Sequence, residues 1–146
     1  MKKLYLLSVI LSGIFIQQSF AQSVAHDRCA RLANGLNLNN WMEDYWSAVY
    51  NPSPTRFTRA DIVKMKAAGM RSLRLPVCFA LLTDTLPPYN VDTTHAVYSL
   101  IDSVIQWAQD YDMMLIIDNH HAWDIYNENW RQKIDRFSHA WSVIAY

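Results

Sequence analysis

The chain has 146 residues, with 13 basic and 13 acidic side chains and therefore no formal net charge at neutral pH. This length allows one modest domain with a real core, or a portion of a larger domain. The sequence holds no basic cluster and no charged tail, so we exclude nucleic acid as a partner. Six tryptophans and eight tyrosines are many for this length, although aromatic rings fill cores more often than they line sites.

The first 21 residues are typical of a secretory signal peptide. Two lysines precede an apolar stretch over residues 4–16, and the small residues Ser19 and Ala21 are placed for cleavage. The stretch is shorter than the roughly 20 apolar residues that a membrane-spanning helix needs. We therefore predict cleavage after Ala21, a secreted or periplasmic protein, and no membrane association of the mature segment 22–146.

The mature segment alternates between strand and helix patterns. Residues 32–38 (LANGLNL) are the first predicted strand, followed by the polar and aromatic loop NNWMEDYW and the turn signal NPSP. A helix is then predicted to begin at Thr58, because Asp61 stands three residues on as in a capping box. Gly69 is predicted to end this helix.

The second predicted strand runs from Arg71 to Val77. Its leucines share one face, so Arg74 points away from them. A loop containing Pro87 and Pro88 leads to a long predicted helix from about Thr93 to Asp110. The apolar stripe of this helix recurs at helical spacing and consists of Val97, Leu100, Ile101, Val104, Ile105 and Ala108.

The third predicted strand, Met113 to Asp118, begins with five uninterrupted apolar residues. A half-buried strand would alternate, so this run favours a strand covered on both faces, as in a parallel sheet between helices. After the loop AWDIYN, a last helix is predicted with an apolar side made of Trp130, Ile134, Phe137, Trp141 and Ile144.

The order strand, helix, strand, helix, strand, helix indicates an α/β fold with a parallel sheet and right-handed crossovers. No glycine-rich loop follows a strand, which removes the usual signature of a dinucleotide-binding doubly wound sheet. A (β/α)8 barrel needs about 250 residues. Two folds therefore stay open, a doubly wound sheet and the amino-terminal portion of a (β/α)8 TIM barrel with about three β/α units.

The two cysteines, Cys29 and Cys78, could form a disulfide in an oxidising compartment. The predicted strands place them at opposite ends of neighbouring strands, roughly 15 Å or more apart, whereas a disulfide requires Cα atoms within about 7 Å. We therefore expect two free thiols.

Polar side chains gather where the predicted strands end, which is the rim on which barrel sites are built. An arginine on an inward face keeps its charge, so Arg74 needs an acceptor, and Glu43 and Asp118 are the candidates. The set comprises Asn37, Asn39, Asn40, Trp41, Glu43, Arg74, Asp118, His120, His121, Trp123 and Asp124.

The adjacent histidines, His120 and His121, have two interpretations. Neighbouring residues of a strand point to opposite faces, so both can face one ligand only if the backbone has turned. This disfavours a metal site, and we predict no metal and no cofactor. A metal-dependent barrel hydrolase that uses His120, His121 and Asp124 stays as an alternative.

Five segments, in their order and spacing, resemble the first half of a glycoside hydrolase family 5 catalytic domain. They are GLNLNNW, FTRADIVKMKAAGMRSLRLPV, the helix ending in WAQDYD, LIIDNHH and the closing amphipathic helix. The resemblance covers about Arg31 to Tyr146. It implies that 22–146 is a partial (β/α)8 catalytic domain of a cellulase-like retaining β-glycosidase, an O-glycosyl hydrolase that acts on a β-linked polysaccharide or oligosaccharide and is a monomer at full length.

The resemblance also assigns roles to residues of this chain. Arg74 matches the arginine beside the catalytic nucleophile, and His120 matches the histidine of the active-site hydrogen-bond network, so both have supporting roles in catalysis. Asn39 stands where such proteins usually have glycine. The residues expected to contact the sugar are Asn40, Trp41, His121 and Trp123.

Two glutamates carry the chemistry of retaining glycosidases. The family places them after its fourth and seventh strands, so we expect both beyond Tyr146 and expect this chain alone to be inactive. Asn127 and Glu128 resemble the acid/base pair but follow no apolar strand, and we interpret them as loop or helix cap. A non-catalytic carbohydrate-binding protein is the other alternative, although such modules are usually all-β.

Overall fold

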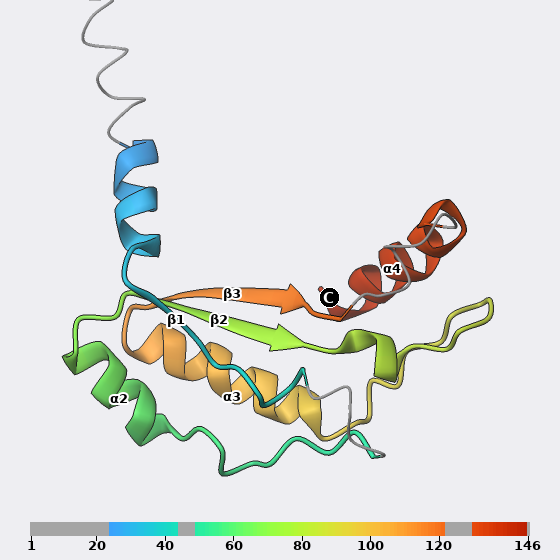
Figure 1. Ribbon diagram of the computed structural model, residues 1–146, viewed down its shortest axis with the longest axis horizontal. Coiled ribbons are helices and arrows are strands. Elements are labelled where there is room, and N and C mark those ends of the chain that lie inside the picture. Colours follow the sequence, from blue (N-terminus) through green and yellow to red (C-terminus); the bar gives the residue numbers. More distant parts are fainter. Residues whose placement is uncertain (1–23, 44–48, 122–129, 146) are drawn as a thin grey trace, which may run out of the picture. The chain divides into compact units, whose positions relative to one another are not determined.

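The computed structural model describes residues 24–43, 49–121 and 130–145 (Figure 1). The chain divides into two compact units, Met1–Ala33 and Asn34–Tyr146. In the first unit, residues 24–32 form an exposed helix. The predicted signal peptide lies outside the described residues. None of the helices that the structure describes is both long enough and apolar enough to cross a bilayer.

The second unit is built on a sheet of three parallel strands in the order β1-β2-β3 (Figure 1). Each strand is joined to the next by a crossover, as predicted from the alternating pattern. Because the strands are parallel, their carboxyl ends lie along one edge of the sheet. The strands are β1 (Gly35–Asn37), β2 (Ser72–Val77) and β3 (Met114–Asn119).

Helices α2 and α3 cover the same side of this sheet (Figure 1). A short 3-10 turn, η1, follows β2, and one further helix, α4, follows β3. The described elements thus alternate as expected for successive β/α units. The bounds are α2 (Arg59–Ala67), η1 (Phe79–Leu82), α3 (Val97–Asp110) and α4 (Trp130–Ile144).

The predicted boundaries of α2 are confirmed. Thr58 precedes the helix, and the Asp61 carboxylate accepts hydrogen bonds from the Thr58 amide (3.0 Å) and the Thr58 hydroxyl (2.8 Å). These two bonds hold the pKa of Asp61 below its ordinary value. Gly69 follows the helix with φ of +89°, a left-handed conformation that glycine adopts without steric cost.

Helix α3 begins four residues later than the predicted Thr93. The Asp92 carboxylate accepts hydrogen bonds from the Thr94 amide (3.0 Å) and hydroxyl (2.7 Å), and His95 Nδ1 accepts one from the Val97 amide (3.2 Å). These local side-chain bonds stabilise turns instead of helix, so the regular helix begins only at Val97.

The first strand is shorter than predicted, and the expected range of 32–38 was wrong at its start. Leu32 closes the helix of residues 24–32, and Asn34 has a left-handed φ of 54° that separates it from β1. Cys29 therefore lies on a helix. Both cysteines are free thiols, Cys29 exposed and Cys78 buried, and burial raises the pKa of the Cys78 thiol.

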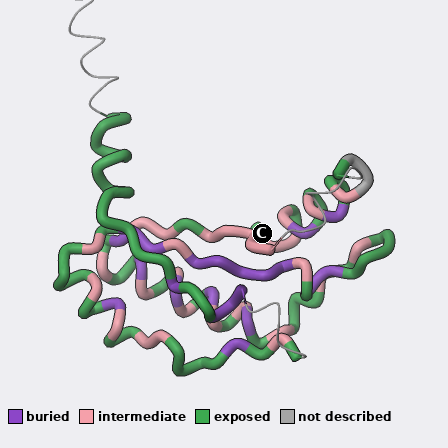
Figure 2. Tube along the Cα trace, viewed as in Figure 1, coloured by how far each residue is buried: buried purple, intermediate pink, exposed green. Residues whose placement is uncertain are grey.

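The core lies between the sheet and its helices. Leu73, Leu75 and Val77 of β2 are fully buried, together with Ile62 of α2. The stripe predicted for α3 supplies its side of the core through Val97, Ile101, Val104 and Ala108. Burying this apolar face is the main source of stability for the unit. In Figure 2, β2 is buried along nearly its whole length.

The third strand is covered less than its apolar run predicts. Its residues are half-buried, and Ile116 is 44% exposed. Ile116 pairs with Arg74 and lies on the face that points away from the helices. The expectation of a strand covered on both faces is therefore wrong for the chain as described, because α3 covers one face only.

The predicted apolar side of α4 is also only partly correct. Trp130 and Ile134 are exposed, whereas Arg136 and Ala140 are buried. Arg136 tolerates burial because its guanidinium donates to backbone carbonyls. These carbonyls belong to Ala80 (2.7 Å), Thr83 and Asp84 (2.8 Å), in and after η1. The pattern of apolar residues could not predict that Arg136 is buried, because its three acceptors are backbone carbonyls.

Candidate functional site

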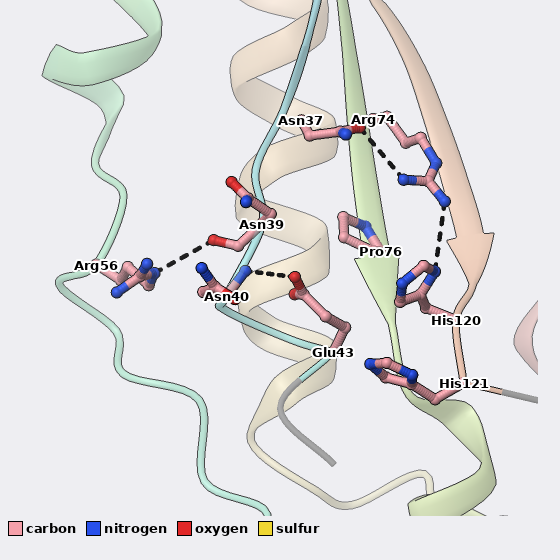
Figure 3. A pocket seen from close by; sticks show the side chains of 9 residues that line it. All are labelled: Asn37, Asn39, Asn40, Glu43, Arg56, Arg74, Pro76, His120 and His121. Atoms are coloured by element: carbon pink, nitrogen blue, oxygen red, sulfur yellow. Dashed lines mark hydrogen bonds between the residues drawn. The ribbon is translucent and has the colours of Figure 1, made fainter. Parts of the chain in front are cut away.

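A cavity of about 600 Å³ opens at the carboxyl ends of the strands (Figure 3). Its walls come from β1, β2, the loop after β1 and the turn after β3. The carboxyl ends of the strands, where polar side chains were predicted to gather, therefore enclose a cavity large enough for a ligand. Its lining is almost entirely polar. The lining residues are Asn37, Asn39, Asn40, Glu43, Arg56, Arg74, Pro76, His120 and His121.

Three side chains, Arg74, Asp118 and His120, join β2 and β3 at this rim. Arg74 Nη2 donates a hydrogen bond to Asp118 Oδ2. Arg74 Nη1 donates to Asn37 Oδ1 at 3.3 Å, as Figure 3 shows. Asp118 Oδ2 also lies 2.9 Å from His120 Nδ1. Of the two candidate partners for Arg74, Asp118 is the one that the structure shows. The side chains of Arg74, Asp118 and His120 are each about one third exposed.

This arrangement assigns the tautomer of the neutral His120 ring. Arg74 Nη2 lies 3.3 Å from His120 Nδ1, but it already donates to Asp118. A guanidinium has no acceptor atom, so it cannot accept a proton from His120 Nδ1. A proton on Nδ1 can donate to the Asp118 carboxylate, which favours that position. The other ring nitrogen, Nε2, is then an acceptor.

The backbone turns directly after β3, which lets both histidines line the cavity. The strand ends at Asn119, and His121 has a left-handed φ of 55°. The rings of His120 and His121 meet edge to face, with centroids 4.5 Å apart. The condition set by strand alternation, that the backbone must turn first, is therefore met.

The loop after β1 is closed by its own carboxylate. Glu43 is 8% exposed, and its two oxygens accept hydrogen bonds from the amides of Asn40 and Trp41, the latter at 3.0 Å. Asn40 adopts a left-handed φ of 53°, which asparagine tolerates better than most residues. Asn39 has no positive φ, so the position where the family usually has glycine does not require one here.

Trp41 lies in the core and not on the cavity wall, unlike the expectation for a sugar-binding residue. It is 2% exposed, its indole nitrogen donates to the Ser53 carbonyl at 2.7 Å, and its ring packs against Phe57 at 5.4 Å. A ring enclosed in this way has no face free for a ligand. The other expected aromatic contact, Trp123, lies outside the described residues, as do Asp124 and the pair at 127–128.

Sequence reasoning missed two residues of the wall. Pro76 could have been found, because it shares the face of Arg74 by strand alternation. Arg56 left no such signal, since it follows a turn far along the first loop. Its Nε donates to the Asn39 carbonyl at 3.4 Å, which brings it to the opposite side of the cavity from His120 (Figure 3).

The described part of the site offers hydrogen-bonding groups to a polar ligand. Within residues 24–43, 49–121 and 130–145, no group of three or more histidine, cysteine, aspartate or glutamate side chains could hold a metal ion. The positive charge of Arg74 also lies against Asp118 Oδ2 and His120 Nδ1, and it would repel a cation bound by these two atoms. The lining instead offers amide, imidazole and guanidinium groups.

The fold and the position of the site define part of an α/β barrel whose candidate site lies at the carboxyl ends of its strands. The chain belongs to the cellulase family, glycosyl hydrolase family 5, whose model matches residues 30–146. The match to the family model confirms the family expected from the sequence.

Endoglucanase H of Acetivibrio thermocellus is 29% identical over 79% of this chain, and endoglucanase C of the same species is 30% identical over 60% of it. The chain spans only 12% and 25% of the lengths of these relatives. Thermotoga maritima Cel5A, solved with cellobiose, aligns with 82% of this chain and 39% of its own, with a TM-score of 0.66 and 23% identity, and thus shares the fold. The same protein has been solved with mannotriose.

Proposed function

We propose that this chain is part of a secreted glycoside hydrolase that cleaves O-glycosyl bonds of a β-linked polysaccharide with retention of configuration. Membership of family 5 supports the hydrolase class, and the names of the endoglucanase relatives support a cellulase-like substrate. The complexes of Cel5A with cellobiose and mannotriose support β-linked oligosaccharides as ligands. The predicted signal peptide supports export.

The observation that carries this proposal is that Arg74 and His120, both hydrogen-bonded to Asp118, line a polar cavity of about 600 Å³. A sugar presents a ring of hydroxyls, each of which donates and accepts hydrogen bonds. A wall of fixed donors and acceptors satisfies such a ligand, because every polar group it buries needs a partner.

Arg74 and His120 have supporting roles in the proposed chemistry. Retaining hydrolysis uses one carboxyl group as acid/base and a second, about 5 Å away, as nucleophile. In this proposal both are glutamates located beyond the 146 residues. The Arg74 guanidinium faces the cavity and would keep a nearby carboxylate ionised by its charge. His120 Nε2 would accept a hydrogen bond from a sugar hydroxyl, since Nδ1 is engaged by Asp118.

Asn40 and His121 line the cavity and are the proposed contacts to the sugar from this chain. The Asn40 amide can both donate and accept, which suits a hydroxyl group. Trp123 stays a proposed contact, whereas Trp41 would act by packing under the first loop. The proposed protein is a monomer that needs no cofactor.

Binding without turnover tests this proposal. Cellotetraose should bind residues 22–146 in a calorimetric titration and shift the NMR signals of His120 and His121. Replacing His120 with alanine should weaken binding about tenfold, because a buried hydroxyl would lose its partner. His139→Ala is the matched control, since His139 is exposed on α4 and outside the cavity. Absence of binding by every β-linked oligosaccharide tried would contradict the proposal.

A further inference from the structure

The carbonyl of Met42 is held from two sides, directly before the cavity residue Glu43. It accepts a hydrogen bond from the Cys78 amide at 2.8 Å and a second from the Tyr50 hydroxyl at 2.6 Å. Met42 itself is fully buried and forms a parallel bridge with Val77, at the end of β2. The peptide unit between Met42 and Glu43 is thus fixed in orientation by two loops.

Tyr50 is held in place by the segment that leads into α3. His95 Nδ1 accepts a hydrogen bond from the Val97 amide, so the ring proton is on Nε2. His95 Nε2 then donates to the Tyr50 carbonyl at 3.0 Å. The rings of Tyr50 and His95 stack, with centroids 5.3 Å apart and planes inclined by 26°. Burial raises the pKa of Tyr50, which keeps its hydroxyl protonated and able to donate at neutral pH.

The fixed peptide unit sets the backbone position from which the Glu43 side chain extends. From this anchor the carboxylate reaches back to the amides of Asn40 and Trp41 and closes the loop that forms one wall of the cavity. The loop also carries Asn40, whose left-handed φ of 53° belongs to the turn that the Glu43 carboxylate closes. Tyr50 supports this wall from a position outside the cavity lining.

We propose that Tyr50 is a positioning residue for the sugar site: its hydroxyl, on a ring that stacks against His95, orients the Met42 carbonyl and thereby holds Glu43 and Asn40 at the cavity wall. The consequence for ligand affinity depends on the proposed function, whereas the effect on the loop does not. Tyr50 touches no ligand in this account and acts through the backbone.

The chain offers a matched control for removing one tyrosine hydroxyl. Tyr98 is also partly buried, burial also raises its pKa, and its hydroxyl is buried without a hydrogen-bond partner in the described part of the chain. Tyr50→Phe and Tyr98→Phe therefore each remove one hydroxyl group, but only Tyr50→Phe loses a hydrogen bond, the one to the Met42 carbonyl. Both variants should be made in residues 22–146.

Three measurements decide the proposal. In Tyr50→Phe the carbonyl carbon signal of Met42 should move upfield, and the amide protons of Asn40 and Trp41 should shift, because the loop loses its anchor. Cellotetraose affinity should fall about threefold to tenfold. Tyr98→Phe should change none of these. A purely structural role would lower the melting temperature of Tyr50→Phe while leaving the loop signals of the folded protein unchanged.

Tyr50→Phe spectra that match those of Tyr98→Phe at Met42, Asn40 and Trp41 would overturn the proposal. If Tyr50→Phe does not fold, His95→Ala should move the same signals in the same direction by releasing the ring, and unchanged signals there would overturn it equally. A wild-type chain that binds no cellotetraose contradicts the proposed function, but the carbonyl signal of Met42 still decides the role of Tyr50.

Discussion

Strands β2 and β3 are both six residues long and both lead into the same site, yet they differ in how far they are buried. β2 lies between two neighbours, and five of its six residues are buried. β3 is paired on one side only among the described strands, and none of its residues is buried. The apolar run is longer in β3, so burial follows from position in the sheet and not from composition.

The two strands contribute differently to the site as a result. β2 is anchored in the core by Leu75 and presents Arg74 on its other face. β3 contributes Asp118, whose carboxylate is held in place mainly by Arg74 and His120. The hydrogen bond from Arg74, on the well-packed strand, therefore orients Asp118 on the less covered strand.

The largest effect should come from a cavity in the packed strand. Leu75→Ala removes a fully buried side chain and should lower the free energy of unfolding by about 2–5 kcal/mol. Urea denaturation of the variant and the wild type measures this difference. A loss below about 1 kcal/mol would mean that β2 is not anchored by the core and would remove the contrast with β3.

A smaller effect should follow when the link between the strands is broken. Asp118→Asn removes the charge that Arg74 and His120 share, and we expect a loss of about 1–2 kcal/mol because these side chains are partly screened by solvent. The nitrogen NMR signals of His120 should also report a changed tautomer. Asp102→Asn, an exposed change on α3, should leave both measurements as in the wild type.

Acid should act on the helix that leads into β2. The pKa of Asp61 is lowered by hydrogen bonds from Thr58, so its contribution to stability is complete above its ordinary value of 3.8 and is lost as the pH falls through the lower, folded value. Urea denaturation between about pH 5 and pH 3 should show a decline that Asp61→Asn reduces. An identical decline in the variant would contradict this role.

The smallest effect should come from the exposed face of β3. Ile116→Ala removes a side chain that is 44% exposed, so the free energy of unfolding should fall by less than about 1 kcal/mol. The same denaturation experiment measures it beside Leu75→Ala. A loss as large as that of Leu75→Ala would show that something covers this face in solution.

Residues governed by short-range periodicity could be predicted from the sequence. The alternation of a strand placed Arg74 opposite the leucines of β2, and the apolar spacing identified the buried face of α3. The spacing of Thr58 and Asp61 marked the start of α2 because that contact is local. The parallel order of the strands then brought Arg74, Asp118 and His120 to one rim, as expected.

Residues that depend on long-range packing could not be predicted. Asp118 was one of two candidate partners for Arg74, and only the register of β2 against β3 distinguishes it from Glu43. Trp41 lies in a loop, where no periodicity tells a buried ring from an exposed one. Arg136 is buried by carbonyls of a distant turn, and carbonyls are present at every residue.

The balance of charges at the rim has a consequence for how dissolved salt affects ligand binding. Among the described residues, the guanidinium groups of Arg56 and Arg74 line the cavity together with the Glu43 carboxylate, and the Asp118 carboxylate binds Arg74, so these four fixed charges sum to zero. Attraction between a charged site and a charged ligand fades as dissolved ions screen it, but an uncharged ligand in a balanced site has little to screen. Recognition at this rim should therefore be nearly independent of ionic strength.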